Sequence, residues 1–213
     1  EEAVRFTDFK TFIPDFGKVM PERTEAWISY DAENLYFAFK CYDSEPDKIV
    51  ASMKNRDDIR NEDWICVNLD THNDKQAITG FYVNPQGIQM DSRFVAGKDD
   101  ISADYVWYSA GNIDAEGYCI EIRIPLKSIR FSDNDPVEMG VILERKISRL
   151  SIQGMYPEMD PSQGYAFLNQ TMIFTMEGVK HYKLFEAIPA FTYSYRDERT
   201  SGDWSKAKHT SDP

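Results

Sequence analysis

The sequence of 213 residues is poor in several features that mark common protein classes. It has 3 cysteines, which lie far apart, so it contains neither a CxxC metal motif nor enough pairs for a complete disulfide framework. We expect Cys41, Cys66 and Cys119 to be small buried thiols. No uninterrupted apolar stretch approaches the roughly 18 residues that a membrane-spanning helix needs.

Basic residues are outnumbered by acidic ones. The chain has 24 Lys and Arg against 36 Asp and Glu, which gives a formal net charge of −12. Nucleic-acid binding needs a surplus of clustered basic side chains, so this balance excludes nucleic acid as the partner. Neutral ligands and cations remain possible partners.

Sequence motifs of nucleophilic and nucleotide chemistry are also missing. There is no GxSxG elbow, no GxxxxGK[ST] loop and no GxGxxG loop. The 3 histidines include His72, which lies in a polar turn and is typical of a solvated side chain. These absences argue against a serine or cysteine hydrolase and against a nucleotide-dependent enzyme.

The sequence does contain many short apolar runs that alternate with period two and end at turn residues. Clear examples are Leu35 to Cys41, Ile65 to Leu69 and Tyr118 to Ile124. The turns that follow this pattern open with Asp or Asn and close with Gly or Asn, and they comprise Asp31–Asn34, Asn84–Gly87 and Asp114–Gly117. The pattern predicts an all-β, antiparallel two-sheet β-sandwich over residues 1–182. We expect little helix, with one short helix from Ser44 toward Met53 and one turn between Pro125 and Phe131.

Residues 183–213 differ from the rest of the chain. Lys183 to Tyr195 alternates, with an increasingly aromatic face that ends at Phe191, Tyr193 and Tyr195. This pattern predicts the first strand of an outer-membrane β-barrel in the same polypeptide. The alternative is an edge strand of the sandwich, where Pro189 would be tolerated.

Acidic residues offer two kinds of chemistry. A glycosidase needs two carboxyl groups across a glycosidic bond, and the candidates are Asp57, Asp63, Asp91, Asp104 and Glu121. A structural calcium ion could take oxygen ligands from the segments Asp43 to Asp47, Asp57 to Asp63, Asp70 to Asp74 and Asp99 to Asp104. No spacing selects a catalytic pair and no segment fits an EF-hand loop, so solvated loops remain the alternative, and no cofactor is required.

Exposed aromatic rings are the usual platforms for sugar rings. Trp27, Trp64, Trp107 and Tyr108 are the candidates, although a lone tryptophan in a sandwich usually packs in the core. We predict a sugar site at Trp107 and Tyr108, with Arg93 or Asn84 as a polar neighbour and Trp64 as a further platform. Because Trp107 and Tyr108 are adjacent in an extended segment, one of them must face away from the other.

An ordered set of motifs in this chain resembles a known family. The motifs are Arg23-Thr24-Glu25, Tyr30-Asp31, Asn34-Leu35-Tyr36, Cys41-Tyr42-Asp43, Arg56-Asp57, Asp63 to Asp70, Phe81 to Gly87, Asp91, Glu121 to Pro125, Gly140, Arg145 and Arg149. Over roughly Ala3 to Lys183 the sequence resembles the carbohydrate-binding module family 9-like domain. More closely, it resembles the version at the N-terminus of Bacteroidetes outer-membrane β-barrel proteins of unknown function.

The resemblance implies a β-sandwich, carbohydrate as the partner and the cell envelope of a Gram-negative bacterium, in the periplasm or outer membrane. It predicts a non-catalytic carbohydrate-binding module that is linked to glycan binding or breakdown. The chain departs from the sugar-binding members in two places: residues 56–62 lack the aromatic of the tryptophan clamp, and Cys66 stands where binders place a functional Glu. The alternatives are therefore a structural or interaction domain of an outer-membrane barrel protein and, third, part of a glycoside hydrolase.

Overall fold

The structure is a computed structural model, which describes residues 3–182, 189, 198–200 and 203–205. The chain divides into two units, Glu1–Tyr182 and Lys183–Pro213, and each is described by itself. The described part of the second unit is an antiparallel pair, β14 (Glu198–Thr200) with β15 (Asp203–Ser205). Apart from Pro189, the predicted barrel strand lies outside the described residues. Within the described ranges, no helix is both long enough and apolar enough to cross a membrane.

The first unit is built from strands with a few short 3-10 helices. Its strands are β1 (Val4–Phe6), β2 (Lys10–Ile13), β3 (Thr24–Tyr30), β4 (Asn34–Tyr42), β5 (Trp64–Asp70), β6 (Ala77–Val83), β7 (Gln89–Val95), β8 (Lys98–Asp100), β9 (Tyr108–Asp114), β10 (Gly117–Pro125), β11 (Val137–Ile147), β12 (Ile152–Tyr156) and β13 (Met172–Met176). Its 3-10 helices are η1 (Pro46–Lys48), η2 (Leu126–Ser128), η3 (Ser148–Leu150) and η4 (Pro161–Gln170). The predicted helix from Ser44 toward Met53 is thus a single 3-10 turn, because the chain becomes extended again at Ile49.

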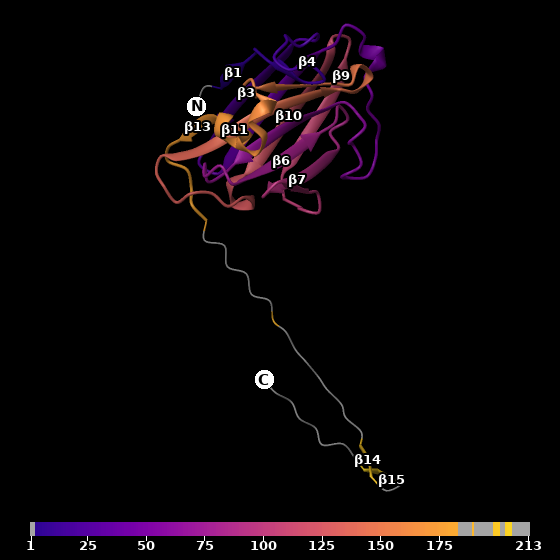
Figure 1. Cartoon of the computed structure of the whole chain (residues 1–213), viewed down its shortest axis with the longest axis vertical. Coiled ribbons are helices and arrows are strands. Elements are labelled where there is room, and N and C mark those ends of the chain that lie inside the picture. Colours follow the sequence, from indigo (N-terminus) through magenta and orange to yellow (C-terminus); the bar gives the residue numbers. More distant parts are fainter. Residues whose placement is uncertain (1–2, 183–188, 190–197, 201–202, 206–213) are drawn as a thin grey trace. The chain divides into compact units, whose positions relative to one another are not determined.

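The strands form two antiparallel sheets. The five-stranded sheet has the order β1-β3-β4-β10-β9, and the eight-stranded sheet has the order β2-β12-β11-β5-β6-β7-β8, with β13 beside β11. Figure 1 shows the two layers, with β4 and β10 in one and β6, β7 and β11 in the other. The predicted all-β, two-sheet sandwich is confirmed.

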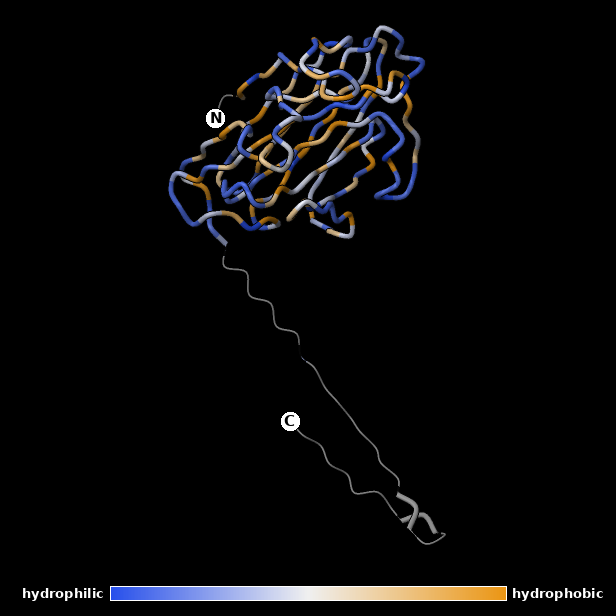
Figure 2. The backbone as a smooth tube through the Cα atoms, in the orientation of Figure 1, coloured by the Kyte–Doolittle hydropathy of each residue, from blue (hydrophilic) through white to orange (hydrophobic). Residues whose placement is uncertain are grey.

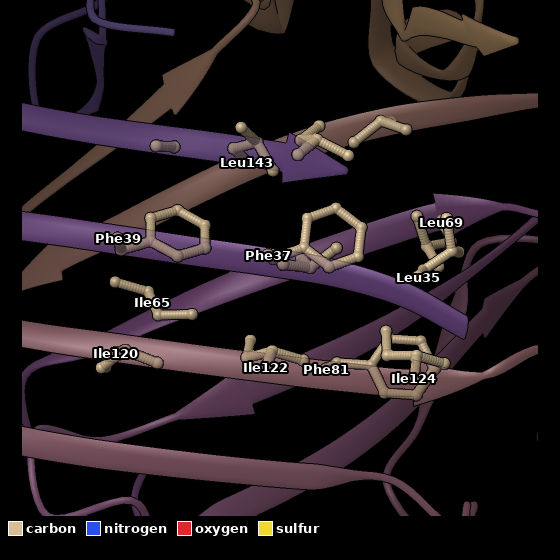
Figure 3. Packing of buried hydrophobic residues seen from close by; sticks show 14 of the residues in the cluster. Leu35, Phe37, Phe39, Ile65, Leu69, Phe81, Ile120, Ile122, Ile124 and Leu143 are labelled. Carbon is tan, nitrogen blue, oxygen red and sulfur yellow. The ribbon is translucent and has the colours of Figure 1, made fainter. Parts of the chain in front are cut away.

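The core lies between the sheets because alternation sends every second side chain inward. Along the tube in Figure 2, hydrophobic and hydrophilic colours alternate on the strands. Figure 3 shows the buried side chains that meet between the sheets: Leu35, Phe37, Phe39, Ile120, Ile122 and Ile124 from the five-stranded sheet, and Ile65, Leu69, Phe81 and Leu143 from the eight-stranded sheet. Burial of this apolar surface is the main force that holds the two sheets together.

The predicted turns join neighbouring strands. The turn at Asn84–Gly87 connects β6 to β7, and the Oδ1 atom of Asn84 accepts hydrogen bonds from the backbone N–H groups of Gln86 at 3.0 Å and Ile88 at 2.8 Å. Gly87 has a φ of 83°, a left-handed conformation that glycine adopts without strain. The sequence pattern therefore sets the register of β7, the strand that carries Asp91 and Arg93.

One of the spaced arginines joins the two sheets. Arg145 of β11 points inward and is fully buried. Its guanidinium group donates hydrogen bonds to the carbonyl oxygens of Tyr42 at 2.8 Å and Arg23 at 3.0 Å, and to Oγ1 of Thr24 at 3.0 Å. These acceptors belong to the other sheet or to the residue just before it. Arg145 is therefore a structural residue, and its presence in the family motif is explained by the fold and not by ligand binding.

Candidate functional site

The two aromatic residues of the predicted sugar site point to opposite sides of the backbone. Trp107 is 4% exposed, donates a hydrogen bond from its indole Nε1 to Oδ1 of Asp91 at 2.5 Å, and packs edge-on against Phe81 at a centroid distance of 5.3 Å. Tyr108 is 50% exposed on the outer face of the five-stranded sheet, where Arg123 lies 4.2 Å from its ring centroid. Of the pair, only Tyr108 presents a ring to a surface ligand.

The other predicted site residues lie elsewhere. Asn84 is fully buried, and its Nδ2 donates to Oε2 of Glu62 at 2.8 Å. Trp64 is 7% exposed and packs edge-on against Tyr82 at 5.1 Å, on the outer side of the eight-stranded sheet. Arg93 is exposed on β7. The fold therefore does not bring the five predicted side chains into one site. Asn84 and Trp107 are buried, and their hydrogen-bonding groups already have partners inside the protein.

Two of the candidate carboxylates, Asp91 and Asp104, pair with Arg56, and a third, Asp57, bonds to the backbone of Asp91. Asp91 is buried and accepts hydrogen bonds from Arg56, from the Trp107 indole and from the backbone N–H of Tyr105 at 3.1 Å. Asp57 accepts from the backbone N–H of Asp91 at 3.3 Å, and Asp104 lies 3.2 Å from the Arg56 guanidinium. Burial raises the pKa of Asp91. The cluster ties two loops to β7, so Asp91 has a structural explanation without catalysis.

The remaining acidic candidates are separated. Asp63 is buried and accepts from the backbone N–H of Ser148 at 2.5 Å, whereas Glu121 is exposed on β10 in the other sheet. Among the residues that the structure describes, no three His, Cys, Asp or Glu side chains gather so as to hold a metal ion. The four acidic segments considered for calcium are all described, and they form no such group.

A cavity of about 280 Å³ lies on the outer face of the eight-stranded sheet. Its floor comes from β5, β6, β7 and β11, and its remaining walls come from β2, β8, β12 and the segment that continues into η4. Figure 1 shows β6, β7 and β11 running side by side in this sheet. The residues that line the cavity are Phe12, Asn68, Ile78, Tyr82, Ser92, Phe94, Asp99, Ile142, Glu144, Met155, Met159 and Phe167. We call this site the outer-face cavity.

The floor of the outer-face cavity is polar because of the strand register. Asn68 pairs with Gly80, and Gly80 pairs with Ser92, so these positions form one row across three strands. A Cβ atom on Gly80 would lie 2.7 Å from Cε2 of Tyr82, 2.9 Å from Oγ of Ser92 and 3.1 Å from Oδ1 of Asn68. Glycine at this position therefore lets three hydrogen-bonding side chains converge on the floor.

A buried carboxyl group stands beside this row. Glu144 is 8% exposed, and its oxygens accept hydrogen bonds from Nδ2 of Asn68 at 2.6 Å and from Nε2 of Gln153 at 2.5 Å. Burial raises the pKa of Glu144 from 4.5 to about 7, and the negative charge of Asp99 adds to the rise. Near neutral pH this group can therefore accept hydrogen bonds as a carboxylate or donate one as an acid.

The walls of the outer-face cavity are apolar and partly aromatic. The rings of Phe94 and Phe167 meet edge-to-face with centroids 5.5 Å apart. Met155 and Met159 belong to the same apolar cluster, which is separate from the main core. A polar floor below apolar walls suits a ligand with hydroxyl groups on one edge and C–H groups on its faces, provided that it is small.

Glu144 and Asn68 were not among the site residues predicted from the sequence. Asn68 interrupts the apolar run from Ile65 to Leu69, and Glu144 follows directly on the apolar run from Val141 to Leu143, each on the outward phase of its strand. That pattern was the available signal, since burying a polar group without a partner is costly. The partners themselves are 76 residues apart in the chain, so only the fold pairs them.

No protein-family model and no curated protein matches the sequence. Among solved structures, a candidate carbohydrate-binding protein from Bacteroides uniformis is similar, with 10% identity, a TM-score of 0.52, and coverage of 83% of this chain and 81% of that one. A family 9 carbohydrate-binding module from Caldicellulosiruptor kristjanssonii in complex with cellotriose has 13% identity, a TM-score of 0.52, and coverage of 86% and 88%. The same kind of module from that organism in complex with glucose has 13% identity, a TM-score of 0.51, and coverage of 85% and 87%. The chain therefore has the family 9-like sandwich fold that the sequence resemblance predicts.

Proposed function

We propose that this chain is a non-catalytic carbohydrate-binding module that holds one sugar residue in the outer-face cavity. The observation that carries the proposal is the combination of a polar floor and apolar walls in that cavity. Hydroxyl groups of a sugar would bond to Asn68, Ser92 and Glu144, while the C–H faces of the ring would pack against Phe94 and Phe167. The fold supports this proposal, because two of the similar structures hold cellotriose or glucose.

The size of the cavity supports a small ligand. Small-molecule sites usually have volumes of about 300 to 1,000 Å³. The outer-face cavity, at about 280 Å³, is at the lower end and fits a single ring better than a long chain segment. We therefore place the end or a side residue of a glycan in the cavity, with the rest of the chain outside it.

The cellular setting is part of the proposal. We place the module in a secreted or outer-membrane protein of a Gram-negative bacterium, in the periplasm or outer membrane, with a role in glycan capture or breakdown. The sequence resemblance to modules that precede outer-membrane barrels supports this setting. Fractionation of cells that express the full-length gene product tests it, and recovery in the cytoplasm would contradict it.

Calorimetric titration of the intact chain tests sugar binding. Glucose, cello-oligosaccharides, xylo-oligosaccharides, mannose and aminohexoses are titrated in turn. Gly80→Val should abolish the heat signal because its side chain would fill the floor, and Tyr108→Ala, on the opposite sheet, is the matched control that should leave it unchanged. Absence of heat with every sugar, or equal loss in both variants, would refute the proposal.

A second candidate function is an interaction domain that binds no sugar. One observation favours it: no tryptophan is among the described residues that line the outer-face cavity, and stacking on tryptophan contributes strongly to sugar affinity. In that case no sugar gives a heat signal in the titrations. Tyr108 and Arg123 on the five-stranded sheet would then be the residues to mutate, since both are exposed.

A further inference from the structure

The charged groups of the outer-face cavity all have the same sign. Glu144 and Asp99 line it, and the described lining residues include no Lys, Arg or His. A ligand that carries a carboxylate, such as a uronic acid, would meet like charges in a site of low dielectric. The cavity therefore discriminates against anionic sugars and favours neutral or cationic ones.

Among the residues that the structure describes, Glu144 has no cationic partner. Its two hydrogen-bond donors are the neutral amides of Asn68 and Gln153. The ionisable groups that interact with it from other strands of the same sheet are Cys66 of β5, Tyr82 of β6 and Asp99 of β8, and none of them is a cation. A buried carboxylate without a cation is costly, so a ligand that supplies the positive charge would gain the interaction that the protein leaves open.

The nearest basic residue along the same face of β11 does not act as a cationic partner of Glu144. Lys146 lies two positions after Glu144, and its Nζ donates to the carbonyl oxygen of Arg60 at 2.5 Å and lies 6.0 Å from the ring centroid of Trp64. Lys146 is also absent from the lining of the cavity. The position beside Glu144 inside the cavity is thus left to a ligand.

We propose that the outer-face cavity recognises an aminohexose, a sugar with a protonated amine, and that Glu144 is the side chain that pairs with its ammonium group. This inference rests on the proposed function, because it names the class of sugar that the same cavity takes. The hydroxyl groups keep their partners on the floor, Asn68 and Ser92. The amine adds a charge-assisted hydrogen bond to a carboxylate that is already oriented by two amides.

Three matched sugars test the proposal by calorimetry on the intact chain at pH 7. Glucosamine, N-acetylglucosamine and glucose have the same ring, but only the first carries a positive charge. We expect glucosamine to bind at least about tenfold more tightly than the other two, because a hydrogen bond to a charged group is worth at least one factor of ten in affinity. Glucuronic acid should give no measurable binding.

Glu144→Gln tests the assigned residue. The amide keeps the size of the side chain, and the Gln153 amide can turn to offer its oxygen, so we expect the variant to fold. It should lower the preference for glucosamine over glucose to about one, with glucose affinity kept within about threefold. Glu121→Gln removes the same charge from an exposed position on the other sheet and should leave the preference unchanged.

A pH series on the unmodified chain gives a second measure that needs no variant. Glucosamine affinity should fall as the pH drops below the pKa of Glu144 and level off near the affinity of glucose, because protonation removes the charge that pairs with the amine, while glucose affinity should not fall. Equal binding of glucosamine and glucose, or equal pH profiles, overturns this inference but leaves sugar binding intact. Failure of every sugar to bind removes the proposed function itself.

Discussion

Glu144→Gln should remove the part of the pH dependence of the free energy of unfolding that comes from the titration of Glu144. Glu144 is buried and has a pKa of about 7, compared with 4.5 for the unperturbed group. The folded chain therefore binds this proton more tightly than the unfolded chain does. The stability that the proton contributes is complete below pH 4.5 and is lost as the pH rises through about 7.

The magnitude follows from the pKa difference. One pKa unit corresponds to about 1.4 kcal/mol, so a difference of about 2.5 corresponds to about 3 kcal/mol between pH 4.5 and pH 8. Glutamine carries no charge at any of these pH values. The free energy of unfolding of the variant, relative to the parent, should thus rise by about 3 kcal/mol from low to high pH.

Urea unfolding at about pH 4.5, 6, 7 and 8, followed by tryptophan fluorescence, measures this difference. Other titrating groups cancel because they are common to both proteins. Glu121→Gln is the control, since an exposed carboxyl group should give a flat difference. If the difference in the free energy of unfolding between Glu144→Gln and the parent does not change with pH, Glu144 is solvated in the native state. The electrostatic argument for the outer-face cavity would then fail.

Four further substitutions test the packing. Trp107→Ala should lower the free energy of unfolding by about 3 to 5 kcal/mol, whereas Tyr108→Ala should change it by less than about 1 kcal/mol, as thermal or urea unfolding can show. Large losses from both would contradict the outward direction of Tyr108. Asn84→Ala should cost about 1 to 3 kcal/mol in urea unfolding, because Glu62 loses a donor and the β6–β7 turn loses its acceptor. Gly80→Ala should cost about 1 to 3 kcal/mol by the same assay, because its Cβ atom crowds the floor of the outer-face cavity, and a neutral result would show that the floor can yield.

The strands were predictable because their signal is local. Leu35 to Cys41, Ile65 to Leu69 and Tyr118 to Ile124 alternate strictly, and they lie in β4, β5 and β10. A period-two pattern says which side chains share a face without knowledge of the partner strand. It does not say which strands are neighbours, since that depends on contacts between distant residues.

The outer face of the eight-stranded sheet was not predictable in the same way. Trp64 was predicted as a further platform for a sugar ring, and in the structure it is buried in a small cluster with Ile59, Cys66 and Met90. The walls of the outer-face cavity include Met159 and Phe167, which lie just before η4 and within it, far along the chain from β5. Alternation within β5 carries no information about such walls, so the sequence alone did not show that a cavity forms there.

One departure from the family pattern, Cys66 in place of a glutamate, can be explained from the structure. The sequence resemblance expects a carboxylate at the position of Cys66, and the thiol there is buried. In the structure the residue that pairs with Cys66 across the strands is Glu144 of β11. Paired residues on neighbouring strands share a face and lie about 5 Å apart. A carboxyl group is therefore present within one strand spacing of the expected place, but it comes from a different strand and is held by Asn68 and Gln153. The carboxyl group that the resemblance expects at position 66 is thus supplied next to it by Glu144, and the proposed preference for an aminohexose depends on this side chain.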